Sequence, residues 1–337
     1  MILVTGGTGL VGSHLLYELT KNGDKVRALK RISSKAETVR KVFGYYNDYP
    51  DQALSRIEWL NGDITNPVDV FQSLDGITSV YHAAGYVSFD PADKKDVLRI
   101  NILGTENMVN ACLEKGIEKL CFVSSTSAIG SAENGELIDE EIFWTSRGKT
   151  SIYAISKYRA EMEVWRGINE GLNSVIVNPS IIIGPGDWQR SSNRLFQEVY
   201  KGIRFYTQGI TGYVDVRDVV KAMILLMNGD FSGERYIISS GNYTYKEILS
   251  MIADSLGKKP PAIKATPFMI KTAYWLDSLR SMITPGKRLI TKDIVVGAGS
   301  RIHFSNKKIC NATGMKFIPV EDSIRYTSKL FLKEVQA

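Results

Sequence analysis

The chain has 337 residues, 44% of them apolar and 23% charged, which is ordinary for a globular protein with a sizeable core. No segment approaches the roughly 20 uninterrupted apolar residues that a membrane-spanning helix needs. The first residues lead into an apolar run without a basic leader or cleavage site, so a cytoplasmic location is expected. The three cysteines lack the paired spacing of a zinc site or a disulfide framework, so we expect no metal site.

The net charge of +6 is unevenly distributed. Residues 258–337 hold 15 Lys and Arg against 5 Asp and Glu, and the first 257 residues are net negative. The field of the C-terminal part favours an anionic small-molecule substrate, an acidic partner or an anionic membrane surface, and a merely solvated basic surface is equally compatible with it. The lysines are dispersed and no nucleic-acid-binding module surrounds them, so nucleic acid is not an expected partner.

The first half of the chain alternates short β-rich runs with helical stretches, which is typical of a parallel sheet covered by helices. Six strands are predicted, at residues 2–4, 25–29, 56–60, 79–82, 119–124 and 174–177. Helices are predicted at 10–22, 93–115 and 152–170, and each is followed by a glycine suited to the positive φ angle of a helix end, namely Gly23, Gly116 and Gly171. After about residue 178 the chain becomes less regular.

The first predicted strand leads directly into a glycine-rich turn, with the sequence TGGTGLVG, that opens a helix. In this context the glycines permit close approach of a pyrophosphate to the backbone, and Gly12 lets helix and strand pack closely. The helix N-terminus then offers N–H groups and a partial positive charge to the phosphates. A purely structural turn is the less favoured alternative. The residues expected to bind a dinucleotide here are Gly6, Thr8, Gly9, Leu10, Val11 and Gly12.

The residue at the end of the second strand usually distinguishes NAD from NADP, because an acid there binds the ribose 2′-hydroxyl and would repel a 2′-phosphate. This chain has Lys30 and Arg31 at that point, so NADP(H) is the expected cofactor and NAD(H) the alternative. Two solvated basic side chains remain the competing interpretation. Asp63, which precedes Ile64 at the end of the third strand, could meet the adenine amino group or serve as a turn residue.

Tyr153 and Lys157 are four residues apart and so share one face of a predicted helix. A phenol with a pKa of about 10 is a weak base, but a neighbouring cation and an oxidised nicotinamide would both favour the phenolate. The same spacing is common by chance, so the assignment depends on hydroxyls at the end of the fifth strand. There we expect Ser125 to hold a substrate oxygen while Tyr153 transfers the proton, with Ser124 or Thr126 as alternatives.

These motifs, in this order, resemble the extended short-chain dehydrogenase/reductases, or NAD-dependent epimerase/dehydratase family. The resemblance covers about the first 240 residues. Besides the residues above it rests on Gly62-Asp63, His82-Ala83-Ala84-Gly85 and Asn101-Ile102-Leu103-Gly104-Thr105. The runs NPSIIIGP at 178–185 and YVDVRDV at 213–219 look closest to the dihydroflavonol-reductase-like and 3β-hydroxysteroid-dehydrogenase-like branch.

The resemblance implies an α/β fold with a Rossmann-type doubly wound parallel sheet and a smaller C-terminal substrate domain. The dinucleotide-binding domain would comprise residues 1–177, with 213–240 returning to it, and the substrate domain 178–212 and 241–337. The family also implies homodimers in many members, through helices such as 93–115 and 152–170.

The family mechanism implies Tyr153 as general acid/base, Lys157 bound to the nicotinamide ribose and tuning Tyr153, and Ser125 steadying the reacting oxygen. It further implies that the cofactor is lined by Ala83, Ala84 and Gly85, with Pro179 near the nicotinamide. Asn101 resembles the family's asparagine beside the active site, and a helix-interior residue bonded to a neighbouring loop is at least as compatible with its position. His82 is expected to be structural.

Among the family's reactions, reduction of a ketone or aldehyde with NAD(P)H, or oxidation of the corresponding alcohol, fits best. Dehydratases usually carry an Asp-Glu pair where this chain has Thr126 and Ser127. A nucleotide-sugar epimerase with tightly bound NAD would usually have an acid after the second strand. A non-catalytic dinucleotide-binding scaffold usually lacks the Tyr or Lys that are present here.

A segment at residues 268–283 mixes aromatic, aliphatic and basic residues and predicts an amphipathic helix. We expect it to cover the substrate pocket, and contact with a membrane surface is the alternative.

Overall fold

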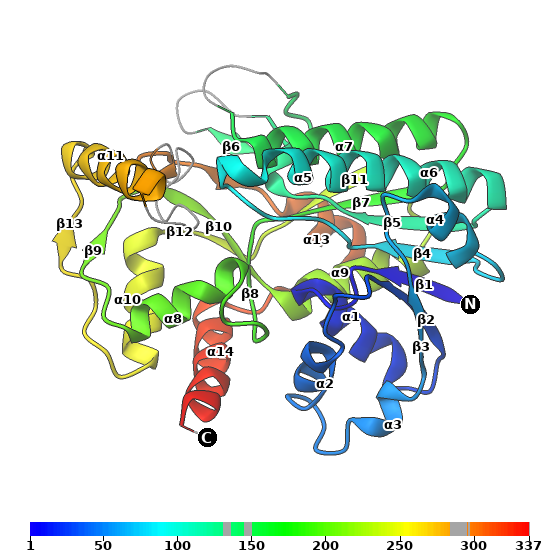
Figure 1. The fold of residues 1–337 in the computed structure, drawn as a ribbon, viewed down its shortest axis with the longest axis horizontal. Helices are drawn as coiled ribbons and strands as arrows, with labels where there is room; N and C mark the ends of the chain where they lie inside the picture. Colours follow the sequence, from blue (N-terminus) through cyan, green and yellow to red (C-terminus); the bar gives the residue numbers. More distant parts are fainter. Residues whose placement is uncertain (131–135, 145–149, 284–294, 296, 337) are drawn as a thin grey trace.

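The structure is a computed structural model that describes residues 1–130, 136–144, 150–283, 295 and 297–336. They form a central seven-stranded sheet with helices on both faces, and a less regular part beside it that carries the C-terminus (Figure 1). The strands of the central sheet are, in spatial order, β11 (Glu234–Ile238), β7 (Ser174–Pro179), β5 (Lys119–Val123), β4 (Ser79–His82), β1 (Ile2–Thr5), β2 (Val26–Lys30) and β3 (Ile57–Asn61).

All neighbouring strands of this sheet are parallel. The six predicted strands all belong to it, each within two residues of its predicted ends. The doubly wound α/β fold is therefore confirmed. The strand order reverses between β1 and β4, and in open sheets of this kind ligands bind outside the carboxyl ends of the strands at such a point. Strand β11, which pairs with β7 at one edge, was not predicted from the sequence.

Alternate residues of each strand face opposite sides of the sheet, because the side-chain period of a strand is two. Val4 belongs to one cluster of buried apolar side chains, which packs against α1 (Leu10–Thr20) and α9 (Val216–Asn228). Leu3 belongs to a second cluster, which packs against α4 (Pro67–Ser73), α6 (Gly104–Lys115) and α7 (Ile152–Asn169). Figure 1 shows these two groups of helices below and above the sheet. The sheet is thus buried on both faces, as a parallel sheet requires.

The glycines predicted to end helices all have a positive φ angle, at 116° for Gly23, 63° for Gly116 and 102° for Gly171. The helix predicted over 93–115 is present, but it is not α-helical throughout. The structure has a short turn η1 (Pro91–Asp93), then α5 (Lys94–Leu98), a π-helical turn η2 (Arg99–Leu103), and α6. Asn101 lies in the π-helical turn, and its side chain bonds the backbone of Tyr86 and the hydroxyl of Ser156. The wider turn coincides with these tertiary bonds, which sequence periodicity does not report.

The C-terminal part is built around a third apolar cluster. Its sheet has the order β12 (Gly241–Thr244), β10 (Ile210–Asp215), β8 (Ile181–Ile183), and α8 (Arg194–Tyr200), α10 (Tyr245–Ser255) and α14 (Val320–Val335) pack around it. Two further strand pairs are β9 (Phe205–Tyr206) with β13 (Ile263–Lys264) and β6 (Leu137–Ile138) with β14 (His303–Phe304). The remaining elements include α2 (Glu37–Phe43), α3 (Asp51–Leu54), η3 (Thr126–Ala128), η4 (Ser191–Asn193), α11 (Pro267–Ile283) and α13 (Lys307–Thr313).

The helix predicted at residues 268–283 is present as α11. Within the part of the chain that the structure describes, no helix is both long and apolar enough to cross a membrane.

Candidate active site

The glycine-rich turn joins β1 to α1 through close backbone contacts. Gly6 has a φ angle of 71°, and its carbonyl accepts a hydrogen bond from Gly9 N over 2.9 Å. A Cβ atom on Gly12 would lie 2.2 Å from the Gly6 carbonyl oxygen, and one on Gly6 would lie 2.6 Å from the backbone of Ala83. Only glycine fits at both positions, so the turn packs as closely as its sequence predicts.

The start of α1 is suited to an anion. Gly9 is the N-cap, no side chain caps the helix, and its first turn has no acidic residue. The first N–H groups of a helix have no partner within it, and here Leu10 and Val11 contribute two of them. Thr8 lies half-buried within the turn. These residues therefore fit the pyrophosphate of a dinucleotide.

The basic residues at the end of β2 have neighbours of their own. Lys30 Nζ donates to Asn61 Oδ1 over 3.0 Å. Arg31 is exposed and close enough for its charge to lower the pKa of Asp63. Burial alone would raise that pKa, but the bonds from Thr65 N (2.8 Å) and Thr65 Oγ1 (2.9 Å) to Asp63 Oδ1, together with Arg31, outweigh it. One carboxylate oxygen of Asp63 thus holds a turn, and Arg31 is accessible from solvent.

Ile64, the residue after Asp63, packs against α6. A Cβ on Gly104 would come within 2.5 Å of the Ile64 side chain, and the Ile64 carbonyl accepts a bond of 3.0 Å from Asn107. The loop after β3 is thereby held against the helix layer next to the carboxyl edge of the sheet.

The segment after β4 contacts both the glycine turn and the side chain of Lys157 on α7. Ala84 N donates to Thr5 Oγ1 over 3.3 Å, and Ala83 lies against Gly6. A Cβ on Gly85 would lie 3.9 Å from Lys157 Nζ and 3.3 Å from the amide oxygen of Asn101. The glycine turn and Lys157 therefore border the same short segment.

His82 is held between two threonines. Its Nδ1 lies 2.7 Å from Thr5 Oγ1, and its Nε2 lies 3.3 Å from Thr105 Oγ1. Burial lowers its pKa to about 3. His82 is therefore neutral at pH 7, and each ring nitrogen faces a threonine hydroxyl.

Tyr153 and Lys157 lie in the first turns of α7, which Ser151 caps by accepting a bond of 2.9 Å from Ala154 N. The Ser125 hydroxyl, just beyond β5, lies close enough to the Tyr153 phenol to lower its pKa. The ring of Phe89 meets the Tyr153 ring edge-on at 5.4 Å between centroids. Burial raises the pKa of Tyr153 above its ordinary value, and the nearby Ser125 hydroxyl only partly opposes this. The phenol therefore keeps its proton at neutral pH.

Lys157 is buried, and its ammonium donates to the Val123 carbonyl over 2.7 Å. The same nitrogen lies 4.7 Å from the centroid of the Phe122 ring. Burial lowers the pKa of Lys157 to about 8, and the negative charge of Glu161 opposes the shift. Lys157 is consequently charged for the most part at neutral pH.

The structure separates the neighbouring hydroxyls at the end of β5. Ser124 Oγ donates to Glu161 Oε2 over 2.6 Å. Ser125 is the hydroxyl that contacts the phenol. The arrangement favours Ser125 over Ser124 as the group that steadies a substrate oxygen.

Glu161 and its partners form a buried polar network that the sequence analysis missed. Glu161 Oε2 also accepts from Asn178 Nδ2 over 2.8 Å, and its Oε1 accepts from Arg235 over 3.2 Å. The same Asn178 amide donates to the Ser125 carbonyl over 3.0 Å. Pro179 follows Asn178 as the last residue of β7. The one signal in the sequence was an acid four residues after Lys157, on the same helix face.

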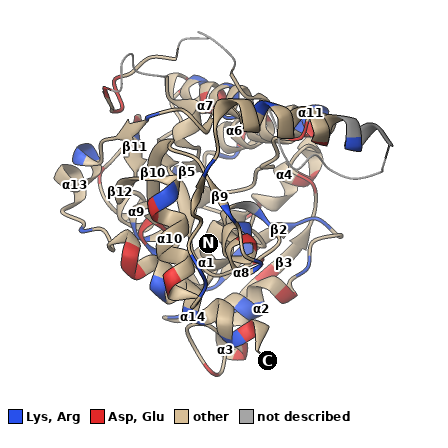
Figure 2. Ribbon diagram, turned by 90° about the vertical axis from the view of Figure 1, so that its left-hand side faces the viewer, with Lys and Arg blue, Asp and Glu red and all other residues tan. Residues whose placement is uncertain are grey.

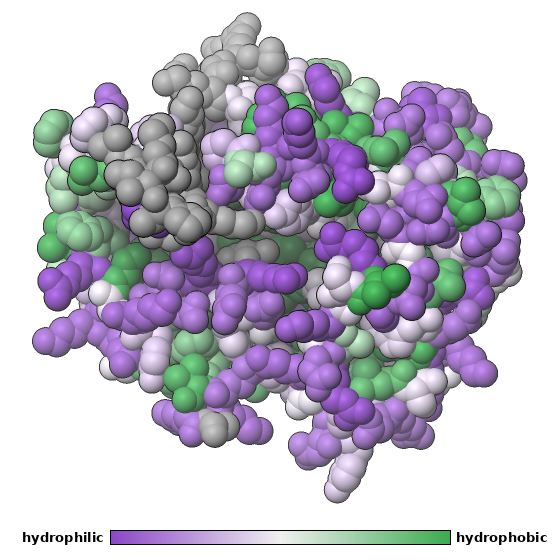
Figure 3. All heavy atoms as spheres, viewed as in Figure 1, coloured by the Kyte–Doolittle hydropathy of each residue, from purple (hydrophilic) through white to green (hydrophobic). Residues whose placement is uncertain are grey.

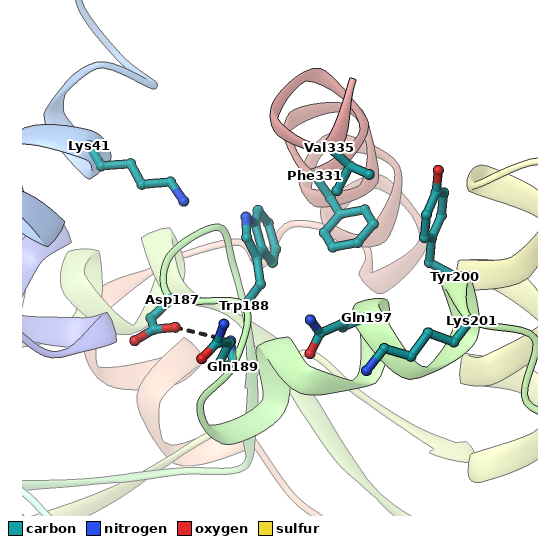
Figure 4. A pocket seen from close by; sticks show the side chains of 9 residues that line it. All are labelled: Lys41, Asp187, Trp188, Gln189, Gln197, Tyr200, Lys201, Phe331 and Val335. Atoms are coloured by element: carbon teal, nitrogen blue, oxygen red, sulfur yellow. Dashed lines mark hydrogen bonds between the residues drawn. The ribbon is translucent and has the colours of Figure 1, made fainter. Parts of the chain in front are cut away.

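A pocket of about 460 Å³ opens elsewhere, between α2, α8 and α14 (Figure 4). Figure 4 shows the Trp188 ring between Lys41 and Phe331. The lining residues are Lys41, Asp187, Trp188, Gln189, Gln197, Tyr200, Lys201, Phe331 and Val335, which include none of the candidate cofactor or catalytic residues. We therefore do not assign the substrate to this pocket.

Comparison with known proteins agrees with the geometry. Residues 2–239 match the profile of the NAD dependent epimerase/dehydratase family. The chain belongs to this family. A putative dihydroflavonol 4-reductase of Synechocystis is 30% identical over 280 residues, covering 81% of this chain and 78% of that protein. A 3-beta-hydroxysteroid dehydrogenase of Mycolicibacterium neoaurum is 25% identical over 292 residues, covering 81% and 74%. The resemblance to this branch is thereby confirmed.

The fold also matches a solved structure, the crystal structure of gox2253. The TM-score is 0.82 at 27% identity, with 99% of this chain and 98% of that chain covered. The similarity extends beyond the family's matched region into the C-terminal part, so the smaller sheet and its helices belong to a known architecture.

Proposed function

We propose that the protein reduces a ketone or aldehyde to the alcohol, with NADPH as hydride donor and Tyr153 as proton donor. The observation that carries the proposal is the proximity of the Ser125 hydroxyl to the Tyr153 phenol, one helical turn from a buried, charged Lys157. A hydroxyl and a phenol that lie this close can both bond one further oxygen, that of the substrate.

The protonation state of Tyr153 supports reduction. Burial keeps its pKa above the ordinary value, so the phenol carries the proton that a developing alkoxide needs. NADPH, when bound, supplies a hydride to the carbonyl carbon. Tyr153 then gives its proton to the carbonyl oxygen, which Ser125 also bonds. The ammonium of Lys157 stabilises the resulting phenolate and would hold the ribose hydroxyls beside Gly85.

The surroundings of the site support a reductase over the other reactions of the family. Thr126 and Ser127 follow Ser125, where a dehydratase would carry an Asp-Glu pair, and β2 ends on Lys30 without an acid. The two relatives described above are named as a reductase and a dehydrogenase, both of which interconvert a carbonyl and an alcohol. The proposed substrate is a small molecule with a ketone or aldehyde group.

The residues that would bind the dinucleotide lie along the carboxyl edge of the central sheet. The glycine turn and the start of α1 would hold the pyrophosphate, Ala83 to Gly85 would line the nicotinamide half with Pro179, and Arg31 would meet the 2′-phosphate. NAD(H) fits the same residues but lacks the 2′-phosphate that Arg31 would contact.

Transfer of deuterium tests the reaction. The purified protein is incubated with NADPH deuterated at either face of C4 and a panel of aliphatic, aromatic and polycyclic ketones and aldehydes. A reductase places one deuterium on the carbinol carbon of a product, from one face only. An epimerase instead retains its hydride within a closed cycle. NAD firmly bound to the purified protein, with no deuterated alcohol from any carbonyl, would contradict the reductase and favour the epimerase.

A further inference from the structure

An exposed apolar surface covers β9, β13 and the start of α11, and we call it the apolar patch. Strand β9 pairs with β13, which places Phe205 beside Ile263, and α11 begins three residues after β13. The patch comprises Phe205 (46% exposed), Ile263 (45%), Phe268 (78%), Met269 (37%), Trp275 (62%) and Leu276 (56%). Figure 3 shows apolar residues at the left-hand edge of the molecule, where Figure 1 places β13 and α11. Two segments distant in the sequence thus build one apolar surface.

The two faces of α11 differ in burial. Phe268, Trp275 and Leu276 follow the i, i+7, i+8 spacing of one helix face and are exposed. On the opposite face Asp277 is buried, and Ile270 and Tyr274 are half-buried. None of the four clusters of buried apolar side chains found among the described residues includes a member of α11. The apolar side of the helix therefore faces outward.

Basic residues predominate around the apolar patch, and the acid beside it on α11, Asp277, is buried and paired with Arg280. Residues 199–214 and 255–276, which contain the patch, hold six basic residues and no Asp or Glu. These are Lys201, Arg204, Lys258, Lys259, Lys264 and Lys271. Arg204, Lys264 and Lys271 are exposed. In the rotated view of Figure 2, α11 lies at the upper edge of the molecule with basic residues along it.

We propose that the protein docks on the surface of an anionic lipid bilayer through the apolar patch. Aromatic and aliphatic side chains ringed by Lys and Arg suit the headgroup interface, where the apolar groups enter the acyl boundary and the cations meet anionic headgroups. A second copy of the chain would bring the same positive charge to the patch, so two patches face to face repel each other. Since no described helix can span a bilayer, the contact is with one surface.

Vesicle binding tests the proposal, and the measurement needs neither substrate nor cofactor, so it is independent of the proposed reaction. The full chain is sedimented with vesicles of phosphatidylcholine, with or without phosphatidylglycerol, at physiological salt. We expect binding only where phosphatidylglycerol is present, and weaker binding as salt rises. Equal binding to both vesicles, or to neither, overturns the proposal.

Two groups of variants separate the apolar and the charged contributions. The triple change Phe268→Ser, Trp275→Ser, Leu276→Ser should weaken binding at least about tenfold, because it removes apolar area from the interface. Lys264→Glu with Lys271→Glu should weaken it by more than about thirtyfold, since each basic residue near an anionic surface contributes a factor of about five. The matched controls are Tyr49→Ser, which is 82% exposed on another face, and Lys25→Glu, also exposed; both should bind as the wild type does.

A conservative variant covers the case in which the triple variant does not fold. Lipids brominated along the acyl chain should quench part of the tryptophan fluorescence of the wild type, and Trp275→Phe should remove that quenched part while vesicle binding persists. Quenching that is unchanged in Trp275→Phe overturns the proposal. So does a loss of self-association in the triple variant, seen by light scattering, with vesicle binding unaltered, because the patch would then join two copies of the chain.

Discussion

Glu161 accepts a hydrogen bond from the hydroxyl of Ser124 over 2.6 Å, which ties the helix that carries Lys157 to the strand end that carries Ser125. Asn178 bonds both Glu161 and the Ser125 carbonyl. The contact between Ser125 and Tyr153 therefore depends on a carboxylate that itself touches neither of them. Glu161 is 2% exposed, and its bond to Arg235 supplies the opposite charge that a buried carboxylate needs.

The first prediction concerns Glu161→Gln, which keeps the shape of the side chain and removes its charge. The negative charge of Glu161 raises the pKa of Lys157, against the burial that lowers it to about 8. Without that charge the pKa falls further, so the loss of cofactor affinity that accompanies Lys157 deprotonation should begin at lower pH. Tyr153 and His82 also face Lys157, and both are neutral near pH 7 because burial raises the pKa of the first and lowers that of the second.

NADPH binding followed by fluorescence across pH 6 to 9 measures this shift, where Lys157 with its pKa of about 8 titrates. Urea unfolding should show a loss of about 3–5 kcal/mol, because Arg235 loses its charged partner. Glu163→Gln is the matched control, since Glu163 lies on the same helix and pairs with Arg166 nearer the surface. A stability loss with an unmoved pH dependence would mean that Glu161 supports the fold alone.

The second prediction concerns the proton donor. Tyr153→Phe should keep the fold and NADPH binding while lowering turnover at least about a hundredfold, the scale of general acid catalysis. Tyr158→Phe is the control on the same helix, because the Tyr158 ring stacks on Trp144. Steady-state rates with the best substrate of the carbonyl panel measure both variants. Full activity in Tyr153→Phe would remove Tyr153 from the mechanism.

The sheet, the glycine turn and the helix of Tyr153 could be predicted because each is encoded locally. The periodicity of strands and helices shows within a few residues of sequence. So does the glycine motif, whose Gly12 leaves no room for a side chain because a Cβ would lie 2.2 Å from the Gly6 carbonyl oxygen. The network around Glu161 could not be predicted in this way, because Arg235 lies 74 residues further along the chain, on β11, the strand that was missed. Asn101 shows the same limit, since its π-helical turn accompanies bonds to residues 15 and 55 positions away.

The third prediction tests the glycine turn. Gly12→Ala places a methyl group 2.2 Å from the Gly6 carbonyl oxygen, so the turn must shift. We expect a loss of about 1–3 kcal/mol in unfolding free energy, as for overpacked sites, and little dinucleotide binding. Gly44→Ala is the control, because Gly44 has an ordinary φ of −64° and its Cβ would make only a normal contact at 3.4 Å. Calorimetric titration measures the affinity of both variants for NADPH and for NADH. Unimpaired binding by Gly12→Ala would mean that the pyrophosphate binds elsewhere.

The last prediction concerns cofactor choice. Arg31 is exposed at the end of β2, whereas Lys30 already bonds Asn61, so Arg31 is the cation expected to meet a 2′-phosphate. A charge-assisted bond of this kind contributes about 1.5–3 kcal/mol, which favours NADPH over NADH about tenfold to a hundredfold at low salt. The carboxylate of Asp63 competes for Arg31, as its lowered pKa indicates, and this places the expected preference at the lower end of that range.

Arg31→Ala should lose affinity for NADPH selectively and leave the affinity for NADH nearly unchanged, as measured by titration at two salt concentrations. The preference of the wild type should shrink as salt rises, because Arg31 is exposed to solvent. Lys35→Ala, an exposed basic residue shortly before α2, is the matched control and should not alter the ratio of the two affinities. The cofactor also bears on reaction direction, because a cell that keeps NADP largely reduced drives such an enzyme toward carbonyl reduction. Tighter binding of NADH by the wild type would contradict the assignment of Arg31 and, with it, the argument for reduction from cofactor choice.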